Sequence, residues 1–162
     1  MYKRQGSTTV TLTINDAPVV LTVDRAMAPC AANAFISLAE QGYYNDTSCH
    51  KLSTGDAKYL QCGDPSGTGN GGSGYSYPVE KEAKAGGSVG SGTLALVADS
   101  QHRLGSQFAL VYGDSKLSDS FLVIGSIDKD GAGSISDIAH KGLADDGLTP
   151  KVDTKIGSVV MG

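Results

Sequence analysis

The chain has 162 residues, the size of one ordinary domain, and 40% hydrophobic and 19% charged residues are typical of a folded protein. Its formal net charge of −4 and the scatter of its 13 basic residues argue against nucleic-acid binding. No apolar run approaches the ~18 residues of a membrane span, and no signal peptide is apparent. We therefore expect a single, monomeric domain over residues 1–162, without membrane contact, whose residues 1–7 form a flexible segment.

The first predicted element is a β-hairpin. β-branched residues recur over residues 9–14 and 19–23, largely in alternation with other residues. Asn15 and Asp16 lie between these two segments and are typical turn residues. The chain is therefore expected to enter its fold as two paired antiparallel strands.

A helix is predicted next, over residues 29–41. Pro29 suits a first helical turn, apolar residues from Phe35 onward recur at helical spacing, and Gly42 is placed to end the helix. Short apolar or β-branched segments then predict further strands at residues 48–52, 57–61, 93–97, 107–112, 121–127 and 155–161.

A second helix is predicted over residues 135–141, with Ser134 as its N-cap and Gly142 behind it. Eight short strands with only two helices favour a mostly β fold, a closed eight-stranded antiparallel barrel capped by two α-helices. Residues 63–92, which are rich in Gly, Ser and Pro, form a long excursion and are a candidate binding loop.

Several motifs with known chemistry fail on inspection. Residues 67–72 match G-x-G-x-x-G, but residues 73–78 cannot open the helix that a pyrophosphate site needs. Residues 128–133 begin like a calcium loop, but Ala139 replaces the bidentate carboxylate, so a solvated turn before the second helix is expected. Ser106 lies in no nucleophile motif. We expect no cofactor, no metal ion and no hydrolytic site.

The three cysteines show no metal-binding spacing, which argues against a zinc site. Cys49 and Cys62 lie on neighbouring predicted strands and can form a disulfide in an oxidising compartment, which would leave Cys30 free. Buried free thiols are the favoured alternative, because cysteine is often a small core residue. The sequence leaves both states open.

Two segments stand out: Gln61-Cys-Gly-Asp-Pro-Ser-Gly-Thr-Gly-Asn-Gly-Gly72 and Gly105-Ser-Gln-Phe108. Together with residues 33–44 and Cys49-His50-Lys51, in this order, they resemble the cyclophilin prolyl isomerases over nearly the whole chain. The cysteines among them are most similar to an actinobacterial branch of that family. The resemblance implies rotation of X-Pro bonds in proline-containing peptides or unfolded proteins, without a cofactor.

The resemblance also implies a site. Cyclophilins use an arginine that donates a hydrogen bond to the prolyl nitrogen, beside a hydrophobic pocket for the proline ring. Carried onto this chain, the catalytic residues are Lys51 and Gln61. The substrate-binding residues are Tyr59, Leu60, Val97, Gln107, Phe108, Ala109, Leu117 and Phe121.

Four positions depart from the family pattern. Lys51 replaces the arginine, Lys58 and Ala109 replace two pocket phenylalanines, and Phe121 replaces a groove histidine. These changes predict an isomerase of weakened activity. The alternatives are a catalytically silent peptide-binding or scaffolding module, and partner recognition by residues 63–92. For the compartment, an extracytoplasmic location within a secreted or membrane-anchored chain is slightly favoured over a cytoplasmic one.

Overall fold

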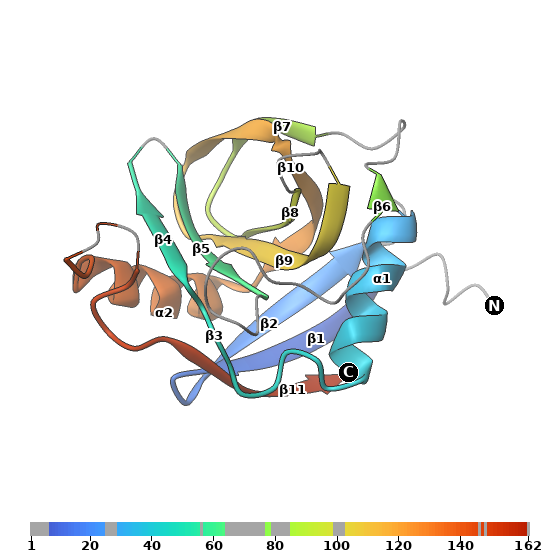
Figure 1. Ribbon diagram of the computed structural model, residues 1–162, viewed down its shortest axis with the longest axis horizontal. Coiled ribbons are helices and arrows are strands. Elements are labelled where there is room, and N and C mark those ends of the chain that lie inside the picture. Colours follow the sequence, from blue (N-terminus) through green and yellow to red (C-terminus); the bar gives the residue numbers. More distant parts are fainter. Residues whose placement is uncertain are drawn as a thin grey trace.

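The computed structural model describes residues 7–24, 29–55, 57–63, 77–78, 85–98, 103–145, 147 and 149–161. These residues form one curled antiparallel sheet with α1 and α2 on opposite sides of it (Figure 1). The elements are, in chain order, β1 (Ser7–Ile14), β2 (Ala17–Asp24), α1 (Pro29–Glu40), β3 (Thr47–Ser48), β4 (Lys51–Thr54), β5 (Lys58–Cys62), β6 (Tyr77–Pro78), β7 (Ala85–Val89), β8 (Thr93–Ala98), β9 (Arg103–Val111), β10 (Ser115–Ile127), α2 (Lys129–His140) and β11 (Lys155–Met161).

The sheet runs in the order β3-β11-β1-β2-β10-β8-β9-β5-β4, with β6 paired to β9 and β7 to β10. Its two end strands, β3 and β4, follow one another in the chain and are separated only by Cys49 and His50. The covalent chain therefore completes the barrel at the point where the hydrogen-bonded ladder is interrupted. The predicted mostly β barrel with two helices is confirmed, as a sheet of eleven strands in place of eight.

The additional strands have identifiable origins. The strand predicted at residues 48–52 is divided into β3 and β4, because the chain changes ladder partners between them. The short strands β6 and β7 lie within the predicted excursion at residues 63–92. Most of the remainder of that excursion, including residues 67–72, lies outside the described residues, as do residues 1–6 of the predicted N-terminal segment. Ser7, the last residue of that segment, begins β1.

The N-terminal hairpin forms as predicted. Ile14 pairs with Ala17, so Asn15 and Asp16 make up the whole turn. Both have positive φ angles, 49° and 68°, which asparagine and aspartate tolerate better than most residues and which a tight two-residue turn requires.

Helix α2 begins earlier than predicted. Its N-cap is Asp128, whose Oδ1 accepts hydrogen bonds from the amides of Gly131 and, on β2, Val20, at 3.1 and 3.0 Å. Ser134 lies inside the helix and donates its hydroxyl to the Asp130 carbonyl. Residues 128–133 are thus a cap and first turn, not a solvated turn. The buried Gly131 lies so close to the Asp128 carboxylate and to β2 that no Cβ fits there.

The buried residues form two apolar clusters. The large one fills the space between the sheet and the helices, where Phe35, Tyr44 and Phe108 pack ring against ring with centroids 5.0–5.5 Å apart. The second cluster draws on β5, β8, β9 and β10 and contains Tyr59, Ala95, Ala109, Val111, Leu117 and Phe121. No helix among the described residues is long and apolar enough to cross a membrane.

Candidate functional site

Five neighbouring strands, β4, β5, β9, β8 and β10, present one continuous face. Residues directly opposite each other in an antiparallel ladder point to the same side, as do alternate residues of one strand. Lys51 lies opposite Gln61, Gln61 opposite Ala109, and Ala109 opposite Ala95. We call this side the site face; it comprises Lys51, Tyr59, Gln61, Ala95, Val97, Gln107, Ala109, Val111 and Phe121.

An aromatic pair crosses the apolar part of the site face. The rings of Tyr59 and Phe121 meet nearly edge to face, with centroids 5.0 Å apart, although β5 and β10 are separated by β9 and β8. The two intervening strands contribute Ala109 and Ala95, both 0% exposed. Only small side chains at these positions let the two rings meet above them, so the alanines set the space in which the rings lie.

The cluster is completed from the other side of the ring of strands. Leu117 lies near the beginning of β10, where that strand pairs with β7, and Val89 of β7 packs against the same cluster. Figure 1 shows β7 and this part of β10 across the ring from β9. Tyr59 and Phe121 keep 6% and 8% of their surface exposed. The cluster is therefore largely enclosed, with a narrow aromatic margin toward solvent.

Polar side chains lie at one end of the aromatic pair. Gln61 Nε2 donates to Gln107 Oε1 at 2.6 Å, which fixes the two amides against each other. Lys51 Nζ lies 5.7 Å from the centroid of the Tyr59 ring, within the range of a cation–π contact. The site face thus places a cation, two amides and an apolar surface side by side.

The glycine and serine of the two signature segments explain why the glutamines meet. Ser106 Oγ donates to the Gly63 carbonyl at 2.7 Å, and Tyr44 donates its hydroxyl to the Ser106 carbonyl at 2.9 Å. Gly63 has φ +100°, and a Cβ there would collide with the Ser106 carbonyl. This close approach ties the end of β5 to β9 and so brings Gln61 and Gln107 together.

Two predicted binding residues lie elsewhere. Leu60 and Phe108 are fully buried in the large cluster, on the opposite side of the sheet, because each neighbours a site-face residue in its own strand. The structure brings the other predicted site residues together: Lys51, Tyr59, Gln61, Val97, Gln107, Ala109, Leu117 and Phe121.

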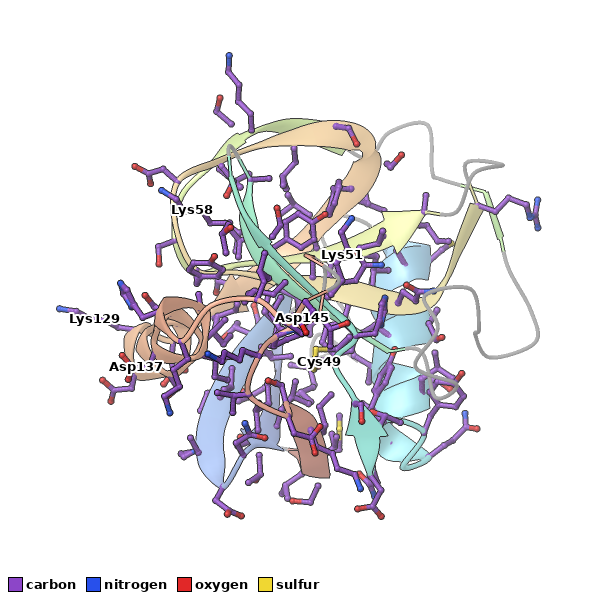
Figure 2. The ribbon with its side chains drawn as sticks, turned by 60° about the vertical axis from the view of Figure 1, so that its left-hand side comes forward. Cys49, Lys51, Lys58, Lys129, Asp137 and Asp145 are labelled. Atoms are coloured by element: carbon purple, nitrogen blue, oxygen red, sulfur yellow. A yellow bond between two sulfur atoms is a disulfide. The ribbon has the colours of Figure 1, made fainter. Side chains whose placement is uncertain are left out.

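Lys58 does not belong to the site face. Its side chain is exposed, and its methylene groups cover Gly113 at the far end of β5. Figure 2 shows Lys51 and Lys58 well apart. Tyr59, the next residue of β5, points into the cluster, so β5 contributes an aromatic side chain although Lys58 replaces the family's phenylalanine.

Ala95, Val111 and Val89 were missed as site residues. The alternation of side chains along a strand could have identified two of them. Val111 lies two residues beyond Ala109, and Ala95 lies two residues before Val97, so each shares a face with a predicted site residue. Val89 gave no such signal, since its place depends on the pairing of β7 with β10.

The strand that carries Lys51 is held at both ends. Near Lys51, Cys49 and Cys62 form a disulfide, whereas the sequence analysis favoured free thiols. Cys30 is a free, exposed cysteine. At the far end Tyr112 donates its hydroxyl to the Ser53 carbonyl at 2.7 Å. Burial raises the pKa of the Tyr112 phenol, which keeps it a protonated donor.

No metal centre is apparent: within the described ranges, no three His, Cys, Asp or Glu side chains gather as ligands. The site face itself carries a cation, two amides and two aromatic rings.

Comparison with known proteins places this geometry in a family. The sequence model of the cyclophilin type peptidyl-prolyl cis-trans isomerases matches residues 9–161. A probable peptidyl-prolyl cis-trans isomerase B of Mycobacterium tuberculosis is 35% identical over 158 residues, covering 91% of this chain and 51% of that protein. Its Mycobacterium leprae counterpart is 36% identical over 153 residues, covering 88% and 52%. The chain spans about half the length of these relatives.

Solved structures agree on the fold. A cyclophilin type isomerase of Cryptosporidium parvum superposes with a TM-score of 0.79 at 24% identity, covering 96% of this chain and 98% of that one. A second crystal structure of that protein, obtained in the presence of the dipeptide Ala-Pro, gives a TM-score of 0.76 at 24% identity and covers 95% and 98% of the two chains.

Proposed function

Because this chain belongs to the cyclophilin type peptidyl-prolyl cis-trans isomerase family, we propose that its site face rotates X-Pro bonds in peptides and unfolded proteins. The proposal rests on the arrangement of side chains on the site face. A lysine ammonium, a hydrogen-bonded glutamine pair and an apolar aromatic surface share one side of five neighbouring strands.

The reaction needs no covalent intermediate. Amide resonance sets a barrier of about 18–20 kcal/mol, and in the twisted transition state the lone pair of the prolyl nitrogen is localised. A donor that meets this nitrogen stabilises the twisted state more than either planar state, which is the requirement for catalysis. We assign this role to the Lys51 ammonium, whose place beside the Tyr59 ring supports the assignment.

Substrate binding is assigned to the remaining site-face residues and to Leu117, which belongs to the same apolar cluster. Tyr59, Phe121, Val97 and Leu117 supply the apolar surface for a proline ring. Gln61 and Gln107 carry amides, which both donate and accept, as an extended peptide backbone requires. The crystal structure of the Cryptosporidium protein in the presence of the dipeptide Ala-Pro supports the choice of an X-Pro ligand.

We propose that turnover is weak. A lysine is a point charge on a flexible stem, whereas an arginine presents a planar fork of donors. Lys51→Arg is therefore expected to raise kcat/KM by about tenfold, which corresponds to about 1.4 kcal/mol of transition-state stabilisation. An unchanged or lower kcat/KM would show that the lysine does not limit the rate.

A protease-coupled assay on an Ala-Pro peptide tests the activity. We expect the native protein to accelerate isomerisation above the thermal rate and Lys51→Ala to lose about 100-fold in kcat/KM. Lys58→Ala is the matched control, because it removes a lysine from the neighbouring strand away from the site face, and should leave the rate unchanged. No acceleration by native protein at high concentration would contradict the proposal.

One observation favours a second function, a silent module that binds proline peptides. The rings of Tyr59 and Phe121 keep an exposed margin, 6% and 8% of their surface, and this margin can contact a proline ring whether or not Lys51 reaches the prolyl nitrogen. Saturable binding of the Ala-Pro peptide without acceleration would support this function.

We also propose that the domain acts as a monomer in an oxidising, extracytoplasmic compartment. The Cys49–Cys62 disulfide supports the compartment, since such bridges persist where thiols are oxidised. Thiol labelling of the protein in fractionated cells tests it: bridged cysteines resist alkylation until a reductant is added. Light scattering of the purified chain tests the monomer.

A further inference from the structure

Lys51 lies on a short strand at the end of the sheet. Its strand, β4, has four residues, ends the sheet and, among the described strands, pairs with β5 alone. The far end of β4 is held by Tyr112, which bonds to the Ser53 carbonyl, but Lys51 lies at the other end. The contacts that hold Cys49 and His50, directly before Lys51, therefore determine where the Lys51 ammonium lies relative to Gln61.

The attachments of that segment include two backbone hydrogen bonds and one covalent bond. The Cys49 amide donates to the Thr154 carbonyl at 2.9 Å, and the His50 amide donates to the Gln61 carbonyl at 3.2 Å. The third attachment is covalent: the disulfide joins Cys49, two residues before Lys51, to Cys62, the residue after Gln61. Figure 2 shows the bridge at Cys49 and the labelled Lys51 side chain.

The bridge acts from the opposite side of the sheet. Cys49 and Cys62 are both buried in the large cluster, at 3% and 0% exposure, whereas Lys51 and Gln61 are on the site face. The cross-link therefore lies away from the proposed substrate-binding surface. It couples the two strand segments that carry the cation and one glutamine, and it does not touch the aromatic pair, which is held by β5, β8, β9 and β10.

We propose that the Cys49–Cys62 disulfide is a positioning element, which fixes Lys51 against Gln61 and makes the site sensitive to reduction. The kinetic part of this inference rests on the proposed isomerase function. Because the cation acts in the transition state and the aromatic pair binds the ground state, loss of the bridge lowers kcat and leaves KM nearly unchanged. A displacement of Lys51 by about 1 Å is enough to cost about 10- to 100-fold in kcat.

The redox step is a two-electron exchange. A dithiol such as dithiothreitol breaks the S–S bond, supplies two electrons and two protons, and leaves the thiols of Cys49 and Cys62 with the cyclic, oxidised reductant. Since both sulfur atoms belong to buried residues, reduction requires opening of the end of β5 and is expected to be slow.

The test compares oxidised and dithiothreitol-reduced native protein with the variants Cys49→Ala/Cys62→Ala and Cys30→Ser. Reduction should lower kcat about 10- to 100-fold in the native protein and in Cys30→Ser, which keeps the bridge and lacks the exposed thiol. The double variant should be slow from the start and insensitive to reductant. Equal kcat in the oxidised and reduced native protein, or a rise in KM alone, would overturn the proposal.

Amide hydrogen exchange provides a readout that does not need activity. After reduction, protection should fall at residues 51–54 and 61 while residues 94–96 and 108–110, in the β8–β9 ladder, stay protected. Unchanged protection at residues 51–54, or equal loss in both ladders, would overturn the positioning role. If native protein lacks isomerase activity, the proposed function fails, and the exchange pattern still decides this inference.

Discussion

Ala109→Phe should disrupt the site rather than restore a missing pocket ring. Ala109 is fully buried beneath the place where the Tyr59 and Phe121 rings meet, so a third ring has no space there. Overpacking of this kind costs about 1–3 kcal/mol. Separation of the ring pair removes a further contribution of about 0.5–1.5 kcal/mol. We therefore expect a loss of roughly 1.5–4.5 kcal/mol in the free energy of unfolding.

A double-mutant cycle tests the shared space. Phe121→Ala leaves a cavity and should itself cost about 3–5 kcal/mol, but in Ala109→Phe/Phe121→Ala the new ring can fill that cavity. The combined loss should be smaller than the sum of the two single losses by about 1–3 kcal/mol. Urea unfolding, monitored by circular dichroism, measures the free energy of unfolding of the native protein, the two single variants and the double variant. In fluorescence titrations with an Ala-Pro peptide, the double variant should likewise bind more tightly than the sum of the two single losses predicts.

Ala139→Phe supplies the matched control. Ala139 lies on α2 and packs against the large cluster, away from the aromatic pair, so its effect should add to that of Phe121→Ala. Simple additivity of Ala109→Phe and Phe121→Ala would refute the reasoning, because it would mean that the two side chains do not compete for one space.

Three further substitutions test how the site is held. Gly63→Ala should cost about 1–3 kcal/mol in thermal unfolding, because of the positive φ and the collision with the Ser106 carbonyl; a neutral effect would contradict the close approach of β5 to β9. Ser106→Ala removes the bond to the Gly63 carbonyl and should lower stability by about 1 kcal/mol in urea unfolding. Ser118→Ala is the control and should cost less, because Ser118 is exposed and its hydroxyl accepts from the Ser120 amide in a solvent-exposed bond. Tyr112→Phe should cost about 0.5–1.5 kcal/mol at neutral pH. Because burial raises the pKa of Tyr112, the folded state favours the neutral phenol, so native stability should fall as pH rises above about 10, and less steeply in Tyr112→Phe; identical alkaline slopes would contradict this.

Local sequence signals predicted those elements whose causes are local. The hairpin turn at Asn15 and Asp16 and the helix that begins at Pro29 depend on residues within a few positions. The start of α2 does not, since Asp128 caps it while also bonding to β2, 108 residues away in the chain. Gly131, which argues against a helix by propensity, is required by the close contact of that helix with Val19.

The site shows the same division. The two signature segments identified the pair of Gln61 and Gln107. The backbone of Gly63 lies so close to the Ser106 carbonyl that few residue types fit there, and this constraint is visible in the local sequence. Family correspondence alone could not tell the two faces of a strand apart, so Leu60 and Phe108 were assigned to the groove although they belong to the large cluster. The meeting of Tyr59 with Phe121 depends on the order of four strands, which no local pattern contains.

The central claim, that the site face is an isomerase site, is tested most directly by two-dimensional NMR exchange spectroscopy on an Ala-Pro peptide with catalytic amounts of the protein. The account predicts exchange peaks between the cis and trans forms with native protein, greatly weakened peaks with Lys51→Ala, and amide shift changes centred on Gln61 and Gln107. Undiminished exchange peaks with Lys51→Ala, or shift changes confined to α2, would contradict it.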